Sequence, residues 1–190
     1  MMTPAHNLPD RLDRDRCLLV VIDIQERFRD VIHRLDMVLA GTDRLVRFWQ
    51  ALGLPVIVTE HYPRGLGHTV PEVKDAVTPW APLEKIHFSC AGDEGFMAAV
   101  RTAGRDQVVL CGIETHVCVY QTAFDLLRDG RQVAVATDAV SSCLPEDREA
   151  GLGRMRDLGV QLMSTQMIMF EILGRAGTAD FKAVAPILKS

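Results

Sequence analysis

Three side chains that could share one reaction stand far apart in the sequence: a cysteine, a carboxylate and a lysine. Cys118 follows an apolar run at 108–111, in the first turn of a helix predicted to begin with Thr115 as its N-cap and to end at Gly130. Unpaired N–H groups and the positive end of that helix favour a thiolate, below the free-cysteine pKa of about 8.5. The position suits a nucleophile, although cysteine is also common as a small buried hydrophobe.

Asp23 and Lys85 are the partners that such a thiol would need. Asp23 directly follows the apolar run at 17–22, and Lys85 lies among apolar neighbours within 83–89. The aspartate could instead cap the segment that follows it, and a lysine in a strand could simply face solvent. If both side chains reach Cys118, the carboxylate can accept the thiol proton and the ammonium can stabilise negative charge.

The histidines of the Gly- and Pro-rich segment at 60–72 are candidate metal ligands or substrate contacts. His61 and His68 lie in this predicted loop. A metal site usually needs three protein ligands, and no firm third ligand accompanies these two, so we predict no metal and no cofactor. The five cysteines form no CxxC pair, which argues against a zinc site or a disulfide framework.

The composition is typical of one globular domain. The 190 residues, 48% hydrophobic and 24% charged, can build a sizeable core, and we expect an N-terminal arm at 1–16 before a single domain at 17–190. The net charge of -4, with both signs interspersed, predicts no nucleic-acid partner. The apolar runs are too short to cross a bilayer and the charged start is unlike a secretory signal, so we expect no membrane contact and a cytoplasmic protein.

Apolar runs alternate with helical patterns along the domain. The predicted strands are at 17–22, 55–59, 83–89, 108–111, 132–137 and 160–163. The predicted helices are at 35–52, 92–103, 115–130, 145–158, 167–173 and 181–188. This alternation predicts a doubly wound three-layer α/β/α fold with a mainly parallel six-stranded sheet. Right-handed crossovers then bring the strand ends at Asp23 and Gly112 together at the topological switch point, where such folds bind ligands.

Four stretches of the sequence carry a family resemblance. They are VVIDIQ, TEHYPRGLGHTVPE, LEKIHFSC and CGIETHVCVYQTAFDLLRDGRQVAVATDAVSSC. Together they resemble the isochorismatase-like cysteine hydrolase superfamily, and within it the branch of isochorismatase domain-containing proteins. The resemblance implies a nucleophile at Cys118, a general base at Asp23 and a positive group at Lys85. It also implies a non-proline cis peptide bond between Ile113 and Glu114.

The resemblance and the chemistry of the three side chains predict a hydrolase of a small amide or amide-like C–N bond. The sulfur would attack the carbonyl carbon, and the backbone N–H groups of Glu114 and Cys118 would stabilise the oxyanion before an acyl thioester forms. The substrate is expected to be small because the site would lie in a crevice among loops. Tyr62, His68 and His116 are the candidate substrate contacts.

Departures from the family argue against two of its activities. Nicotinamidases carry an Asp-x-His metal set, and Thr59 stands where that aspartate would be. Isochorismatases proper usually lack a cysteine at the position of Cys118. Both activities are therefore less expected than hydrolysis of another small amide.

A redox-sensing or non-catalytic member of the same fold is the alternative from another class. A sensor often needs a resolving thiol, so Cys111 or Cys143 would have to approach Cys118. A hydrolase needs Asp23 and Lys85 within hydrogen-bond reach of that sulfur. The geometry at position 118 therefore discriminates between the two.

Self-association has one candidate surface in the sequence. The stretch at 163–173 is apolar on most sides and rich in methionine, which suits core, a subunit contact or a mixture of both. Relatives within the resembled superfamily form dimers and larger rings. We therefore expect a homo-oligomer that acts on a small-molecule substrate.

Overall fold

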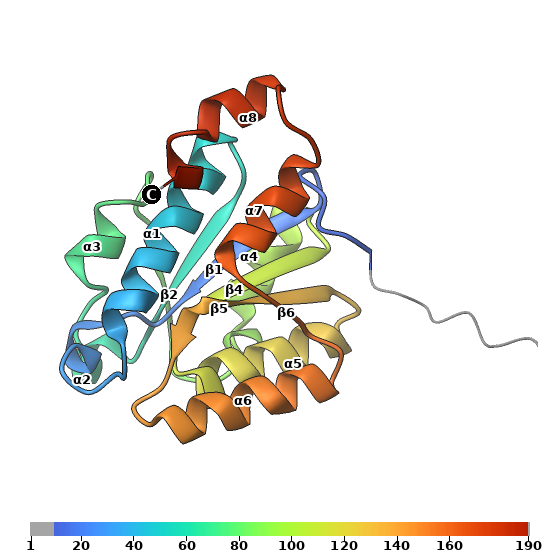
Figure 1. Ribbon diagram of the computed structural model, residues 1–190. Helices are drawn as coiled ribbons and strands as arrows, with labels where there is room; N and C mark the ends of the chain where they lie inside the picture. The colour runs from blue at the N-terminus through green and yellow to red at the C-terminus, as the bar shows by residue number, and fades with distance from the viewer. Residues whose placement is uncertain (1–9, 190) are drawn as a thin grey trace, which may run out of the picture.

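An open six-stranded parallel sheet forms the centre of the protein (Figure 1). The computed structural model describes residues 10–189. The strands are β1 (Cys17–Ile22), β2 (Val56–His61), β3 (Leu83–Lys85), β4 (Gln107–Ile113), β5 (Gln132–Ser141) and β6 (Gln161–Met163). They are ordered β3-β2-β1-β4-β5-β6, and every neighbouring pair is parallel. The predicted doubly wound α/β/α fold is confirmed.

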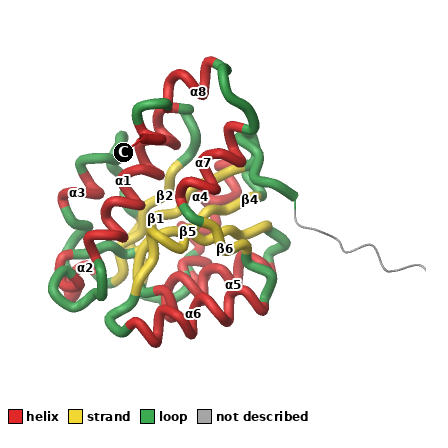
Figure 2. The backbone as a smooth tube through the Cα atoms, viewed as in Figure 1, coloured by secondary structure: helices red, strands yellow, loops and turns green. Residues whose placement is uncertain are grey.

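Helices cover both faces of this sheet (Figures 1 and 2). One face carries α1 (Leu35–Ala51), α3 (Pro71–Lys74), α7 (Thr165–Leu173) and α8 (Ala179–Val184). The other carries α4 (Glu94–Ala103), α5 (Tyr120–Arg128) and α6 (Pro145–Asp157). The short helix α2 (Pro63–Leu66) follows β2, 3₁₀ turns form at Glu26–Phe28, Cys90–Gly92 and Ile187–Lys189, and Thr115–Val119 is a π-helical turn.

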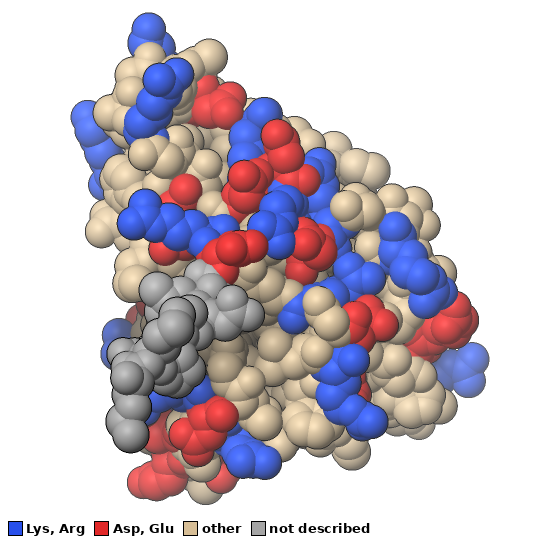
Figure 3. Space-filling view, turned by 90° about the vertical axis from the view of Figure 1, so that its right-hand side faces the viewer, with Lys and Arg blue, Asp and Glu red and all other residues tan. Residues whose placement is uncertain are grey.

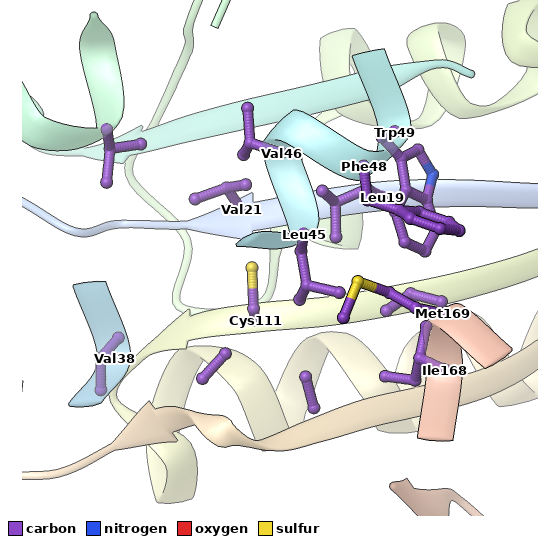
Figure 4. Close-up of a cluster of buried hydrophobic side chains, with 14 of the residues drawn as sticks. Leu19, Val21, Val38, Leu45, Val46, Phe48, Trp49, Cys111, Ile168 and Met169 are labelled. Atoms are coloured by element: carbon purple, nitrogen blue, oxygen red, sulfur yellow. The ribbon is translucent and has the colours of Figure 1, made fainter. Parts of the chain in front are cut away.

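The central strands send alternate side chains into two separate cores. Leu19 and Val21 of β1 pack with Trp49 and other residues of α1 and α7, as Figure 4 shows. Leu18 and Val20 pack on the opposite face against α4, α5 and α6. All residues of β1 are fully buried, which is typical of a parallel strand covered on both sides. A rigid base therefore lies beneath the carboxyl ends of the strands.

The sheet winds in opposite directions from β1 and β4. β2 and β3 lie on one side of β1, and β5 and β6 lie on the far side of β4. Gly112 in β4 adopts a φ of 116°, and a Cβ there would lie 2.1 Å from the carbonyl oxygen of Ile22. Only glycine allows the two strands to approach so closely. The strand ends at Asp23 and Gly112 therefore lie side by side, as predicted.

Several predicted bounds are wrong for local physical reasons. The strand predicted at 83–89 ends at Lys85, because the next residues turn back and direct their carbonyl oxygens at its ammonium group. The predicted loop at 60–72 contains α2 and the first half of α3, which both begin with a proline, a residue suited to the first helical position. The N-cap of the helical segment after β4 is Glu114 rather than Thr115.

The predicted N-terminal arm at 1–16 is described only in part, since residues 1–9 lie outside the described residues. Leu12 is buried in the core on the α1 side. The backbone N–H of Asp13 donates to Oε1 of Gln107, at the start of β4. Residues 10–16 therefore contact the domain, and the arm as a separate unit stays a prediction.

The methionine-rich stretch at 163–173 divides between core and surface. Ile168, Met169 and Ile172 are buried, whereas Met167 and Phe170 of the same helix α7 are about half exposed. No helix within residues 10–189 is long and apolar enough to span a bilayer.

Helix α6 packs closely against the π turn that follows β4. A Cβ at Gly151 would lie 2.9 Å from Cα of His116 and 3.1 Å from the carbonyl carbon of Thr115. Two residues later in the same helix, a Cβ at Gly153 would meet nothing within 4 Å. The two glycines therefore separate the effect of close packing from that of helix propensity.

We expect Gly151→Ala to lower the free energy of unfolding by about 1–3 kcal/mol, because the new methyl group must displace the backbone of the π turn. Gly153→Ala is the matched control and should raise the free energy of unfolding by roughly 0.5–1 kcal/mol, since alanine is the better helix former. Urea denaturation of both variants measures the difference. Equal stabilisation by the two substitutions would contradict the close packing.

Candidate active site

A buried ion pair lies at the carboxyl end of the sheet. Oδ2 of Asp23, which follows β1, is 2.6 Å from Nζ of Lys85, the last residue of β3, and both side chains are 1% exposed. Strand β2 lies between them, and its Thr59 donates from Oγ1 to Oδ1 of Asp23 at 2.7 Å. Both carboxylate oxygens thus have a partner. A charge buried this deeply is tolerable only under that condition.

Lys85 also faces three further acceptors. Its ammonium group donates to the carbonyl oxygens of His87 at 3.1 Å and Phe88 at 3.3 Å, and to Sγ of Cys118 at 3.8 Å. Burial works to lower the pKa of Lys85, but the Asp23 carboxylate more than offsets it, so the pKa lies above its ordinary value. The ammonium group therefore stays charged at neutral pH.

The thiol of Cys118 lies in the π turn and is 7% exposed. Burial raises its pKa well above the usual value, the Asp23 carboxylate raises the pKa further, and Lys85 only partly opposes them. Of the two states open from the sequence, a protonated thiol or a thiolate paired with Lys85, this environment favours the thiol, because desolvation and the nearby carboxylate outweigh the helix end. At rest, a protonated sulfur lies beside a carboxylate–ammonium pair.

A pocket of about 260 Å³ opens beside this sulfur. Its titratable lining residues are Asp23, His61, Glu114 and Cys118. Its apolar lining residues are Phe28, Leu66, Phe88, Ile113 and Val117. They come from the ends of β2 and β4 and from the segments that follow β1 to β4, so the pocket lies over the predicted edge of the sheet.

The three predicted substrate contacts lie outside the residues that line this pocket. Tyr62 is about half exposed and lines a neighbouring hollow. Nδ1 of His68 is 2.9 Å from Oε2 of Glu60, and its side chain is largely exposed. Nδ1 of His116 is 3.0 Å from Oγ of Ser142. The structure brings Asp23 and the other two members of the predicted triad together, but not these three residues.

The two loop histidines do not converge on a common centre. His61 lines the pocket, whereas His68 pairs with Glu60, and the hydroxyl of Thr59 is directed at Asp23. Burial lowers the pKa of His61, and the Lys85 ammonium lowers it further, so the imidazole is neutral at pH 7. Within residues 10–189, no cluster of three or more His, Cys, Asp or Glu side chains is arranged to hold a metal ion.

The π turn changes the hydrogen bonds around the predicted oxyanion donors. The peptide bond between Ile113 and Glu114 is cis. The carbonyl oxygen of Glu114 accepts from the N–H groups of Val117 and Val119. In a regular α-helix the N–H of the residue between those two, Cys118, would be the partner of that oxygen. Its N–H is therefore not committed to the bond that an α-helix would impose.

Two polar residues that organise the site were not singled out as functional from the sequence. The Gln25 side chain accepts from the backbone N–H of His61 at 2.7 Å and donates to the carbonyl oxygens of His61 and Gly67. It thereby ties the segment after β1 to the pocket wall. Thr59 supports the Asp23 carboxylate from within a strand. The sequence signal that could have identified these residues is a polar side chain inside an apolar run, as at Thr59, or shortly after one, as at Gln25.

Comparison with known proteins finds similarity over most of the chain. Residues 17–167 match the family model of the isochorismatase domain. Isochorismatase domain-containing protein 2 of Danio rerio is 36% identical over 179 residues, which cover 94% of this chain and 89% of the relative.

Two solved structures resemble the fold closely. A structure of the MAR1 ribonuclease from Caenorhabditis elegans has a TM-score of 0.89 and 34% identity, over 95% of this chain and 93% of that one. The structure of YcaC from Pseudomonas aeruginosa with hexane-2,5-diol and covalent acrylamide has a TM-score of 0.85 and 25% identity, over 98% and 93% of the two chains.

Lys85→Met should lower the free energy of unfolding by about 3–5 kcal/mol, because Asp23 would remain as an unpaired buried charge. The double variant Asp23→Asn/Lys85→Met removes both charges and should recover most of that loss. Guanidinium denaturation at neutral pH measures both. A single variant that is as stable as the double variant would contradict a tightly coupled ion pair.

Asp23→Asn should lower the pKa of the Cys118 thiol. The substitution removes a carboxylate that raises this pKa and leaves the Lys85 ammonium that lowers it, so thiolate should form at lower pH than in the wild type. Thiolate absorbance across a pH titration measures the shift, with Asp23→Asn/Cys118→Ser as the background for the variant and Cys118→Ser for the wild type. Coincident titration curves would show that Asp23 does not act on this sulfur.

Proposed function

Because the chain belongs to the isochorismatase family, we propose that it is a cysteine-dependent hydrolase that cleaves a small amide or amide-like C–N bond. The observation that carries the proposal is the convergence of Asp23 and Lys85 on the thiol of Cys118 beside a small pocket. A nucleophile, a base and a positive group buried together are the requirements of acyl transfer. A simple binding module would gain nothing from burying the ion pair.

In the proposed first half-reaction, Asp23 accepts the thiol proton while the sulfur of Cys118 bonds to the carbonyl carbon. The Lys85 ammonium offsets the negative charge on sulfur as the proton leaves. The backbone N–H groups of Glu114 and Cys118 donate to the oxyanion, and one such donor typically contributes about 2.7–4 kcal/mol. The C–N bond then breaks, the amine leaves with the proton from Asp23, and an acyl thioester remains.

Water completes the proposed cycle. Asp23 takes a proton from a water molecule while the water oxygen attacks the thioester carbonyl. The C–S bond breaks, the carboxylic acid leaves, and the proton returns from Asp23 to the sulfur. One water is consumed, and one acid and one amine are released. The same carboxylate therefore acts as base and as acid in each half-reaction.

The positions of Cys111 and Cys143, the two candidate resolving thiols, favour the hydrolase over a redox sensor that would use either of them. Cys111 is buried in the core on the α1 side of the sheet, and Cys143 packs against that same core. Cys118 belongs to the core on the opposite face. Cys111 would have to cross the sheet to reach the sulfur, and Cys143 packs against the core on the side away from it.

A small-molecule substrate is proposed in preference to RNA, although one similar structure is described as a ribonuclease. The net charge is -4. On the face shown in Figure 3, Lys and Arg side chains alternate with Asp and Glu side chains. Binding that tracks a phosphate backbone depends instead on a continuous basic surface.

We also propose that copies of the chain associate through the exposed side of α7. Met167 and Phe170 present half-exposed apolar side chains there. Methionine and aromatic side chains are enriched at protein interfaces. The size and symmetry of such an assembly form no part of the proposal.

A panel of small amides should be hydrolysed by the wild type, with the release of ammonia or amine. Cys118→Ala should reduce kcat/KM by at least about 10³-fold, since the nucleophile is removed. Cys111→Ala is the matched control, because it deletes a buried thiol on the other face of the sheet and should leave kcat/KM within a few-fold. Equal turnover by wild type and Cys118→Ala, or Cys118-dependent cleavage of single-stranded RNA alone, would overturn the proposal.

A further inference from the structure

The pocket beside Cys118 is lined mostly by apolar side chains. Five of its nine lining residues are apolar: Phe28, Leu66, Phe88, Ile113 and Val117. Phe88 also lies against the imidazole ring of His61, with ring centroids 5.4 Å apart. More than half of the lining residues therefore present hydrocarbon or aromatic surface. Such a wall binds apolar groups and penalises charged ones.

The charged residues that line the pocket are two carboxylates, and each already has a partner in the protein. Asp23 pairs with Lys85 and accepts from Thr59, and the Glu114 carboxylate accepts from the backbone N–H of Cys143 at 2.8 Å. No lysine or arginine is among the described residues that line the pocket. The neutral imidazole of His61 adds no positive charge. A carboxylate on the substrate would meet two carboxylates and no cationic partner.

The Lys85 ammonium group cannot serve as that missing cation. Besides Asp23, it donates to the carbonyl oxygens of His87 and Phe88 and reaches Sγ of Cys118. Its side chain is 1% exposed, and it is not one of the residues that line this pocket. An anionic substrate group could therefore be neutralised only if the catalytic ion pair were broken.

The size of the pocket limits the acyl group. An apolar protein cavity of about 150 Å³ is large enough to hold benzene. The pocket here has a volume of about 260 Å³ and opens to the surface beside the half-exposed Phe88. It can hold one ring or a branched chain of similar size together with the carboxamide, but not a nucleotide or a peptide.

From the apolar wall, the absence of a lining cation among the described residues and the volume, we propose that the substrate is the uncharged carboxamide of a small apolar acid. The proposal rests on the hydrolase function above and specifies its substrate class. The acyl group packs against Phe28, Leu66 and Phe88 while the carboxamide carbon faces the sulfur. Acidic amides of the same size are excluded by the cost of burying a carboxylate without a cationic partner.

Matched amides test this substrate class directly. We expect 4-methylbenzamide to be hydrolysed with a kcat/KM at least about 100-fold above that of 4-carboxybenzamide, since burying an unpaired carboxylate costs several kcal/mol and each tenfold corresponds to about 1.4 kcal/mol. Butyramide and succinamate form a smaller pair with the same expected order. Equal or better hydrolysis of a charged member in either series would overturn the proposal.

A reversal of specificity gives a sharper test. Leu66→Arg places a cation in the pocket wall, and it should shift the ratio of kcat/KM for 4-carboxybenzamide over 4-methylbenzamide by at least about tenfold towards the acid. Leu66→Gln is the matched control, because it changes shape and polarity but not charge. The same ratio in both variants would show that charge in the pocket does not decide specificity.

Binding to Cys118→Ala separates this proposal from the proposed hydrolysis. Calorimetry should detect 4-methylbenzamide and give a much weaker signal, or none, for 4-carboxybenzamide. If the neutral amide binds in this way but the wild type does not hydrolyse it, the hydrolase is wrong and the ligand class stands. If hydrolysis depends on Cys118 but charged amides are preferred, the hydrolase stands and the ligand class is wrong. If neither 4-methylbenzamide nor butyramide binds to Cys118→Ala, the proposed ligand class is also wrong.

Discussion

The ion pair between Asp23 and Lys85 is the constraint on which the arrangement of the site depends. Removing both charges from water costs several kcal/mol per ion unless each finds close partners. Asp23 obtains them from Lys85 and Thr59, and Lys85 obtains them from Asp23 and from two carbonyl oxygens in the segment after β3. The carboxyl ends of β1, β2 and β3 must therefore lie side by side at one edge of the sheet. The chain must also turn back after β3. At this edge of the sheet, protein groups thus replace the water that would otherwise solvate the ion pair.

The same burial determines the state of the sulfur. A low-dielectric site next to a carboxylate keeps the Cys118 thiol protonated at rest, because desolvation and Asp23 together raise its pKa more than Lys85 lowers it. In the proposed mechanism, nucleophilic attack then has to be coupled to transfer of the proton to Asp23. In return, hydrogen bonds to a developing oxyanion are stronger in a site that excludes water than in an exposed one. For the proposed reaction, the site thus lacks a preformed thiolate but provides stronger hydrogen bonds to the oxyanion.

Sequence patterns identified the parts of the site that depend on local regularity. The fully apolar run of β1 fixed the position of Asp23, and the strand-turn-helix pattern after β4 placed Cys118 near a helix start. The pocket wall was not predictable in this way, because Phe28 and Phe88 lie in irregular segments without a period of two or 3.6. The support of Asp23 by Thr59 depends on strand pairing between distant segments. The protonated sulfur depends on burial, which no pattern around position 118 reveals.

The π turn at Thr115–Val119 explains how one short segment can supply both a nucleophile and a hydrogen-bond donor. In an α-helix, the Cys118 N–H would donate to the carbonyl oxygen of Glu114. Here Val119, one residue later, donates to that oxygen together with Val117. With one extra residue in the turn, the Cys118 N–H does not form that bond, and π-helical turns often occur at functional sites. The turn is held from outside by α6, where Gly151 leaves room for its backbone. Helix α6 therefore contributes no side chain to the pocket lining, yet its packing sets the geometry of the proposed oxyanion site.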